Sequence, residues 1–358
     1  MRSKIRELFD KTGIDIALIR SFPNASDPNF AYFSGLSQKH YNENLMLLER
    51  GKKPLVFCSP LEFDSAKKNR QIRAVLLKTR KLFETTVQKK IRRKKAGINF
   101  EYYPNLNLKM LRKFKPKKII NIGKALAELR ETKTPSELSK IKKACQITEK
   151  TLSQIPKIVK IGMTEEKLAF ELEILSRKLG AEELAFPTIV AFGKNAATPH
   201  HESGPTKIQK GNFLLVDFGV KYQNYCSDVS RTFFVGKPTA KQNWAYWVVR
   251  QAQQKAFQTI LPEKKAVEPF TIADRLLFSQ FKQHLPHALG HGLGIKEHDY
   301  PARMGPNENW KFKAGQVLTL EPGIYLKNRF GIRIEDDVLV TKTKCHWLTK
   351  SPAKLVQI

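Results

Sequence analysis

The stretch FLLVDFGVKYQNYCSDVSRTFFVG, residues 213–236, carries two acidic residues within apolar runs. Its two apolar halves flank a short polar segment, which predicts two antiparallel strands joined by a tight turn. A turn centred between Tyr222 and Gln223 sets Asp217 directly opposite Asp228. Because two carboxylates that face each other across paired strands repel, we expect this hairpin to hold something positive between them.

A second stretch, LTLEPGIYLKNRFGIRIEDD at residues 318–337, repeats the arrangement. A turn centred on Asn328 sets Glu321 opposite Glu335. Hard divalent cations with oxygen ligands are the natural partners of such paired acids. The two hairpins together predict a divalent-metal site. The competing interpretation is a coincidence of spacing, since a bulge would shift either register.

Histidines gather in the same half of the chain, where six of the eight fall between residues 200 and 298. A lone histidine is usually structural, but six beside Gly-rich turns favour a functional site. We expect His201 and His284 to be peripheral to it. The six are His200, His201, His284, His287, His291 and His298.

Length and composition limit the class of protein. The 358 residues, 41% of them hydrophobic, suggest two domains with a core in each. No apolar run approaches the roughly 18 residues that cross a bilayer, and the N-terminus has no signal-peptide stretch, which predicts a cytoplasmic protein without membrane contact. The four cysteines form no CxxC pair, which argues against a disulfide framework and a thiolate metal site.

The net charge of +31 is concentrated in the first third of the chain, where residues 1–133 contain 31 basic and 12 acidic side chains. A basic domain of this kind can bind phosphate backbones, so nucleic acid is a possible partner. The segment lacks the interleaved aromatic residues of a base-stacking surface. A solvated, Lys-rich surface is therefore the favoured interpretation.

Short β-type runs alternate with helical patterns over residues 1–130, which predicts an α/β domain. A second domain is expected over residues 134–358, because Thr134, Pro135 and Glu137 match the N-cap, first position and capping-box glutamate of a long helix. Further helices are expected over residues 164–179, 238–260 and 270–281.

The local contexts of the acids resemble a known family, the pita-bread metallopeptidases, and within it the Xaa-Pro branch of prolidase and aminopeptidase P. The motif PNASDPNFAYFSGL at residues 23–36 is similar to the creatinase-type N-terminal domain of the same proteins. The resemblance implies an α/β N-terminal domain followed by an α+β pita-bread domain, and a homodimer. Five residues carry it: Asp217, Asp228, His291 in GHGLG, Glu321 in LEPGIY and Glu335 in GIRIEDD.

The same resemblance implies roles for these five residues around two divalent ions, Mn²⁺ or Co²⁺. Asp217 would hold one ion, Asp228 and Glu335 would bridge both, and His291 with Glu321 would complete the other site. A water shared by the ions would lose its proton near neutral pH and attack the carbonyl of an Xaa-Pro bond. Glu321 would act as the acid and base that moves this proton.

Five further residues are assigned around this centre. His200 and His298 resemble the two non-ligand histidines of the family, which would stabilise the oxyanion and help to bind the proline side of the substrate. Arg333 lies two residues before Glu335, on the same strand face, and would orient the ligand carboxylates. We expect His287 to line the pocket for the proline ring and Tyr325 to support the site from outside.

One departure from the family pattern concerns the substrate. Prolidase-like members often follow the downstream histidine with an arginine that binds the free carboxylate of a dipeptide, whereas HDYPAR here has Ala302 at that position and Arg303 one residue later. The chain therefore resembles either a dipeptidase or an aminopeptidase P that acts on longer peptides, and its compact length favours the first. A third hypothesis is a nucleic-acid- or ribosome-associated binding protein on a peptidase scaffold.

Overall fold

A computed structural model describes residues 1–21, 27–37, 44–103 and 105–358. The chain forms two compact units, Met1–Arg130 and Glu131–Ile358. The first four residues of the creatinase-like motif, 23–26, lie outside the described residues. Within the part of the chain that is described, no helix combines the length and apolarity needed to cross a membrane.

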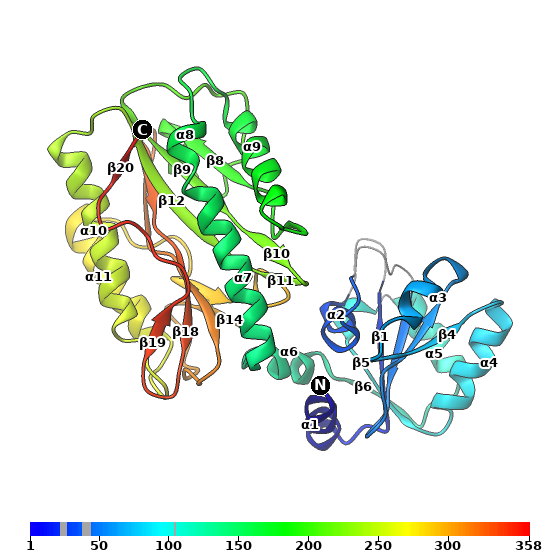
Figure 1. Cartoon of the computed structure of the whole chain (residues 1–358). Coiled ribbons are helices and arrows are strands. Elements are labelled where there is room, and N and C mark those ends of the chain that lie inside the picture. Colours follow the sequence, from blue (N-terminus) through cyan, green and yellow to red (C-terminus); the bar gives the residue numbers. More distant parts are fainter. Residues whose placement is uncertain (22–26, 38–43, 104) are drawn as a thin grey trace. The chain divides into compact units, whose positions relative to one another are not determined.

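The first unit is an α/β domain, as predicted (Figure 1). Its six-stranded sheet has the order β4-β3-β2-β1-β5-β6, and only the pairings of β2 are antiparallel. The strands are β1 Ile16–Arg20, β2 Leu45–Leu48, β3 Leu55–Cys58, β4 Arg73–Leu76, β5 Lys95–Ile98 and β6 Lys118–Asn121. The helices are α1 Arg2–Thr12, α2 Pro28–Ser34, α3 Pro60–Lys67, α4 Arg80–Ile91, α5 Asn105–Lys113 and α6 Gly123–Glu131, with a 3₁₀ turn at Phe100–Tyr102.

The helices of the second unit begin close to where the sequence predicts. Thr134 caps the first of them in a capping box with Glu137, and Thr164 and Thr239 cap two others, because each threonine hydroxyl accepts a backbone N–H of the first turn. The helices are α7 Pro135–Leu152, α8 Ile155–Ile158, α9 Glu165–Lys178, α10 Ala240–Phe257 and α11 Val267–Phe281.

The strands of the second unit form several small sheets, with α7, α8 and α9 packed on one side and α10 and α11 on the other (Figure 1). Alternate residues of the central strands pack to opposite sides: Phe213 and Phe234 contact the α10–α11 side, whereas Leu214 and Phe233 contact the α7–α9 side. The strands are β7 Glu183–Leu184, β8 Ile189–Phe192, β9 Asn212–Phe218, β10 Val220–Tyr222, β11 Tyr225–Cys226, β12 Val229–Val235, β13 Gly290–Gly292, β14 Asp299–Met304, β15 Val317–Leu320, β16 Gly323–Leu326, β17 Phe330–Arg333, β18 Asp336–Val340, β19 Cys345–Trp347 and β20 Val356–Gln357, with a 3₁₀ turn at Gly193–Ala197.

The register predicted for the first hairpin is wrong. Tyr222 pairs with Tyr225, so the turn consists of Gln223 and Asn224, both in the left-handed region with φ of 47° and 67°. Such a two-residue turn matches the twist of the strands, and Asn tolerates this conformation. Along the same register Asp217 pairs with Ser230, so Asp217 and Asp228 are not directly opposite.

The register predicted for the second hairpin is confirmed. Gly323 pairs with Arg333 and Leu320 pairs with Asp336, which centres the turn on Asn328 at φ 61°. The two glutamates lie between these pairs, where the strands separate from one another. There the backbone N–H of Glu321 donates to Leu289, and that of Glu335 donates to Ser230, so each glutamate is anchored to a different neighbouring strand or loop.

All four cysteines are buried, as free thiols. Cys58 lies in the first unit, and Cys145, Cys226 and Cys345 lie in the second. Burial raises the pKa of Cys58 and Cys345 to about 12 and that of Cys145 well above its ordinary value. Their packing is that of small apolar residues rather than of metal ligands or nucleophiles.

Candidate metal centre

Three predicted ligands converge in the second unit. One ligand atom from each of Asp228, His291 and Glu335 lies within 4.8 Å of the other two, and all three residues are buried. Asp228 precedes β12, His291 is the middle residue of β13, and Glu335 lies between β17 and β18. The separation of the second hairpin's strands therefore frees the Glu335 side chain to meet ligands from two other segments.

His291 is oriented for coordination through Nε2. Its Nδ1 lies 3.2 Å from the backbone oxygen of Gly292, so Nδ1 is the donor and Nε2 keeps its lone pair. Nε2 lies 3.5 Å from Oδ2 of Asp228 and 3.6 Å from Oε1 of Glu321. Burial, reinforced by His298, lowers the pKa of His291 to about 3, so the ring is neutral and able to bind a metal.

Asp217 presents one oxygen to the protein and keeps one available. Its Oδ2 accepts from Nη2 of Arg333 at 2.6 Å. Its Oδ1 is buried and has no hydrogen-bond partner among the residues that the structure describes. A buried acceptor without a donor is costly, and a divalent cation at this oxygen would satisfy it.

The acidic cluster comprises Asp217, Asp228, His291, Glu321 and Glu335, and three of its carboxyl groups have pKa values raised above all by burial. Burial, followed by the charges of Glu335 and Asp217, raises the pKa of Asp228 well above its ordinary value. Burial and the charge of Glu321 likewise raise the pKa of Glu335 well above its ordinary value. Burial raises the pKa of Glu321 to about 8, although Arg333 opposes this shift. Divalent ions would favour the ionised forms of all of these acids, so the donor set fits hard divalent cations.

Arg333 is the buried cation beside the cluster. In addition to Asp217, it donates from Nε to Ser230 at 2.8 Å and from Nη1 to the Tyr325 hydroxyl at 3.0 Å and the Pro199 carbonyl at 3.1 Å. Burial disfavours its charge, but Tyr325 and the carboxylates outweigh this and raise the pKa of Arg333 well above its ordinary value. The guanidinium thus stays charged and fixes the Asp217 carboxylate.

Tyr325 and His287 extend this network. The Tyr325 hydroxyl lies 2.9 Å from Nε2 of His287, whose Nδ1 lies 2.7 Å from the Ala288 carbonyl and 3.9 Å from the Glu321 carboxylate. Because Nδ1 donates to a carbonyl, Nε2 accepts from the tyrosine. Burial lowers the pKa of His287 to about 4, so a neutral ring lies beside the acids.

The remaining histidines divide into two groups. His298 is exposed, and its ring centroid is 3.9 Å from that of His291; partial burial and then His200 lower its pKa. His200 is exposed and follows Pro199, the residue bound by Arg333. In contrast, His201 binds Glu165 and His284 binds Asp274, each at 2.8 Å, and neither is in the cluster.

The sequence interpretation missed Ser230 and Thr319. Ser230 donates to Oε2 of Glu335 at 2.8 Å and accepts from Arg333. The Thr319 hydroxyl accepts the backbone N–H of His291 at 3.0 Å. Ser230 lies two residues after Asp228, on the same strand face, so period-two spacing could have identified it.

Arg303, one residue beyond the position at which prolidase-like proteins often have an arginine, binds a surface glutamate. Its Nε donates to Oε1 of Glu308 at 3.1 Å, and its side chain is 67% exposed. In this arrangement the guanidinium is neutralised by a surface acid, so binding a substrate carboxylate would require Arg303 to leave Glu308.

An oxygen-rich acidic cluster with one imidazole, built on hairpins between helices, is a donor set that could hold divalent metal ions. The model of metallopeptidase family M24 matches residues 139–342, and that of the creatinase/prolidase N-terminal domain matches residues 1–132. The chain belongs to metallopeptidase family M24, so the predicted family, enzyme class and fold class are confirmed.

Similar proteins cover nearly the whole chain. The Xaa-Pro dipeptidase of Pyrococcus horikoshii is 32% identical over 99% of this chain and 97% of its own, and an uncharacterized peptidase of Staphylococcus saprophyticus is 33% identical over 90% and 92%. Among solved structures, X-Pro aminopeptidase from Thermotoga maritima has a TM-score of 0.90 at 28% identity, covering 98% of this chain and 99% of that one. The prolidase of Pyrococcus horikoshii has a TM-score of 0.88 at 32% identity, covering 99% of both chains.

Proposed function

We propose that this protein is a dinuclear-metal peptidase that hydrolyses Xaa-Pro bonds in dipeptides or short peptides, with an N-terminal domain over residues 1–130 and a catalytic domain over 134–358. The observation that carries the proposal is the convergence of ligand atoms from Asp228, His291 and Glu335 within 4.8 Å. Membership of family M24 and the names of its similar proteins support it.

Five residues would hold the metal ions: Asp217 with its available oxygen, Asp228, His291, Glu321 and Glu335. Two divalent ions bound there supply Lewis acidity and a nucleophile at neutral pH. The chemistry of an oxygen-rich donor set favours Mn²⁺ or Co²⁺. We also propose that the protein works as a homodimer in the cytoplasm, which gel filtration and fractionation would test.

The protein's own groups would move the proton and bind the substrate. Glu321 is our candidate for the acid and base. Burial raises the pKa of its carboxyl group to about 8 in the metal-free protein, and its Oε1 lies 3.6 Å from Nε2 of His291. His298 and His200 are exposed beside the cluster and would donate to the developing oxyanion. His287 and Tyr325 would contact the proline side of the substrate.

The preferred length of the peptide depends on what binds its carboxylate. A dipeptide presents a free carboxylate next to proline, and Arg303 is bound to Glu308. The alternative of an aminopeptidase P, which would release the N-terminal residue from longer peptides, therefore stays open within the same chemistry. Replacing Arg303 with Ala is expected to raise KM for a dipeptide only if this arginine changes partner when substrate binds.

A hydrolysis assay with Mn²⁺ tests the proposal. Ala-Pro and Ala-Pro-Ala would be compared as substrates for the wild type, for Glu335→Gln and for Glu263→Gln, a matched change at an exposed glutamate. We expect Glu335→Gln to abolish activity and Glu263→Gln to preserve it. If the wild type cleaves neither peptide while calorimetry shows two bound ions, the enzyme proposal is wrong.

The strongly basic first unit gives a separate hypothesis, contact with nucleic acid, that we do not favour. Several of its cations already have acidic partners: Lys90 and Lys94 both contact Glu49, at 2.9 and 3.4 Å. Retention of the full-length protein on RNA at low salt, lost at higher salt, would support this hypothesis.

A further inference from the structure

Gln253 is a fully buried amide in α10 that contacts the backbone immediately before both glutamates of the cluster. Its Nε2 lies 3.0 Å from the carbonyl oxygen of Leu320 and 3.2 Å from that of Ile334. Leu320 precedes Glu321, and Ile334 precedes Glu335. One side chain therefore connects the two strands of the second hairpin at the place where they separate.

The orientation of this amide is fixed from its other end. Oε1 of Gln253 accepts from Nη1 of Arg250, one helical turn earlier in α10. Arg250 in turn lies over the ring of Trp347, 5.7 Å from its centroid, and reaches the Ser351 carbonyl at 3.5 Å. Since the oxygen faces a guanidinium, the two amide hydrogens must point towards the hairpin.

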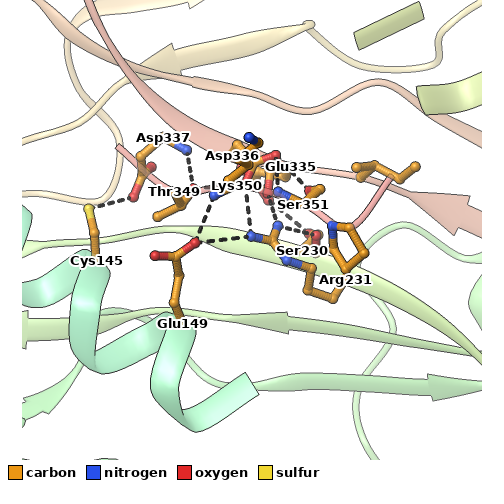
Figure 2. Close-up of polar contacts among 12 residues, drawn as sticks. Cys145, Glu149, Ser230, Arg231, Glu335, Asp336, Asp337, Thr349, Lys350 and Ser351 are labelled. Carbon is orange, nitrogen blue, oxygen red and sulfur yellow. Dashed lines mark hydrogen bonds and ion pairs between the residues drawn. The ribbon is translucent and has the colours of Figure 1, made fainter. Parts of the chain in front are cut away.

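A second set of buried contacts holds the next residue of the same strand (Figure 2). Asp336 accepts from Arg231 Nη2 at 2.8 Å, and Nη1 of Arg231 donates to the Glu335 carbonyl at 2.5 Å. The same carboxylate accepts from the Thr349 hydroxyl at 2.9 Å, from the Ser351 hydroxyl at 2.6 Å and N–H at 3.1 Å, and from Gln253 at 3.1 Å. The backbone around Glu335 is thus held from both sides.

We infer that Gln253 is a positioning residue for the metal centre, which sets the separation of Glu321 and Glu335 by binding the carbonyls that precede them, with Arg231 and Asp336 completing the restraint. Where the strands of the hairpin separate, their mutual hydrogen bonds no longer define the distance between them. Gln253 supplies that restraint from α10. The two glutamates consequently reach the cluster with fixed backbones, which is what tight binding of a cation by carboxylates requires.

The inference rests on the proposed metal centre, and metal affinity tests it separately from peptide hydrolysis. Calorimetry and the visible absorption of Co²⁺ would be recorded for the wild type, Gln253→Met and Gln253→Glu. Methionine keeps the volume but removes both donors, and glutamate keeps the oxygen that faces Arg250. The control is Gln251→Met, a half-buried glutamine of the same helix that bonds to Gln254.

We expect both Gln253 variants to bind Co²⁺ at least tenfold more weakly with an altered spectrum, because lost outer contacts of ligands typically cost 10–100-fold. Gln251→Met is expected to match the wild type. Folded Gln253 variants with wild-type affinity and spectrum would overturn the inference. If both fail to fold while Gln251→Met folds, Gln253 is a folding residue and the inference is equally wrong. If the wild type itself binds no Co²⁺, the proposed function fails instead.

Discussion

Removal of the metal ions should make the stability of the second unit depend strongly on pH between 6.5 and 8. In the metal-free protein, burial raises the pKa of Glu321 from 4.5 to about 8, and those of Asp228 and Glu335 well above their ordinary values. In this range the unfolded chain has lost these protons and the folded protein retains them. The free energy of unfolding therefore falls as the pH rises, and the loss is complete above the folded pKa.

The expected size follows from the Glu321 value. From pH 6.5 to 8 the interval is about 1.5 units, and each unit corresponds to about 1.36 kcal/mol, so this residue alone contributes a loss of about 2 kcal/mol. Asp228 and Glu335 add to it in the same direction. The buried histidines His287 and His291, with folded pKa values of about 4 and 3, are neutral in the folded protein at both pH values, so protonation of the unfolded chain near pH 6.5 changes the stability of the metal-free and loaded samples equally.

Thermal unfolding followed by circular dichroism measures this effect. At pH 6.5 and 8, the midpoint would be compared between chelator-treated protein and protein saturated with Mn²⁺. About 2 kcal/mol shifts the midpoint of a unit of this size by roughly 4–8 °C, so the gap between loaded and metal-free protein should widen by at least that amount at pH 8. Asp337, whose pKa burial also raises to about 8, accepts the backbone N–H of Asp228 and adds a loss of the same sign in the metal-free sample.

A matched variant separates Glu321 from its neighbours. Glu321→Gln cannot ionise, so its metal-free form should lose about 2 kcal/mol less between the two pH values. A gap between loaded and metal-free wild type that stays constant or narrows from pH 6.5 to 8 would show that the carboxylates are not protonated in the metal-free protein. The electrostatic reasoning would then be refuted.

Substitutions at three positions give further tests. Arg333→Met should lower the stability of the folded protein by about 3 kcal/mol in urea titrations, because it leaves Asp217 without its buried partner, and should lower kcat 10–100-fold; unchanged kcat would contradict its role. Tyr325→Phe should lower the free energy of unfolding by about 2 kcal/mol in the same titrations, since it removes the hydrogen bonds of the hydroxyl with His287 and with Arg333. Asn224→Ala should lower stability by about 1 kcal/mol whereas Asn224→Gly should not, because the residue has φ 67°; equal effects would argue against the turn.

The two hairpins show how much of the site is readable from the sequence. The register of the second hairpin could be predicted because its turn has three residues, and the central one, Asn328, readily adopts a left-handed φ. The register predicted for the first hairpin was wrong because Gln223 and Asn224, rather than Tyr222 and Gln223, form the turn. The candidate ligands could still be identified, because acids in apolar strands are conspicuous whichever residue faces them.

Other parts of the site leave no mark on the sequence. Gln253 lies in an ordinary amphipathic helix, and its partners are backbone carbonyls, which every residue possesses. The hydrogen bond from Arg303 to Glu308 likewise depends on the side-chain rotamers of the two residues. Contacts of these kinds depend on the packing of segments distant in sequence, which residue types and spacing do not specify.

Because the four thiols are buried, their reaction with an alkylating reagent would report local or global unfolding of the protein. Because all four thiols are buried and their pKa values are raised, they should resist alkylation at neutral pH as long as their surroundings stay packed. Cys58 marks the first unit and the other three mark the second, so mass spectrometry of labelled protein can time the loss of structure in each unit separately. Added Mn²⁺ should then slow labelling of Cys145, which donates to Asp337 behind the metal centre, while leaving Cys58 unaffected.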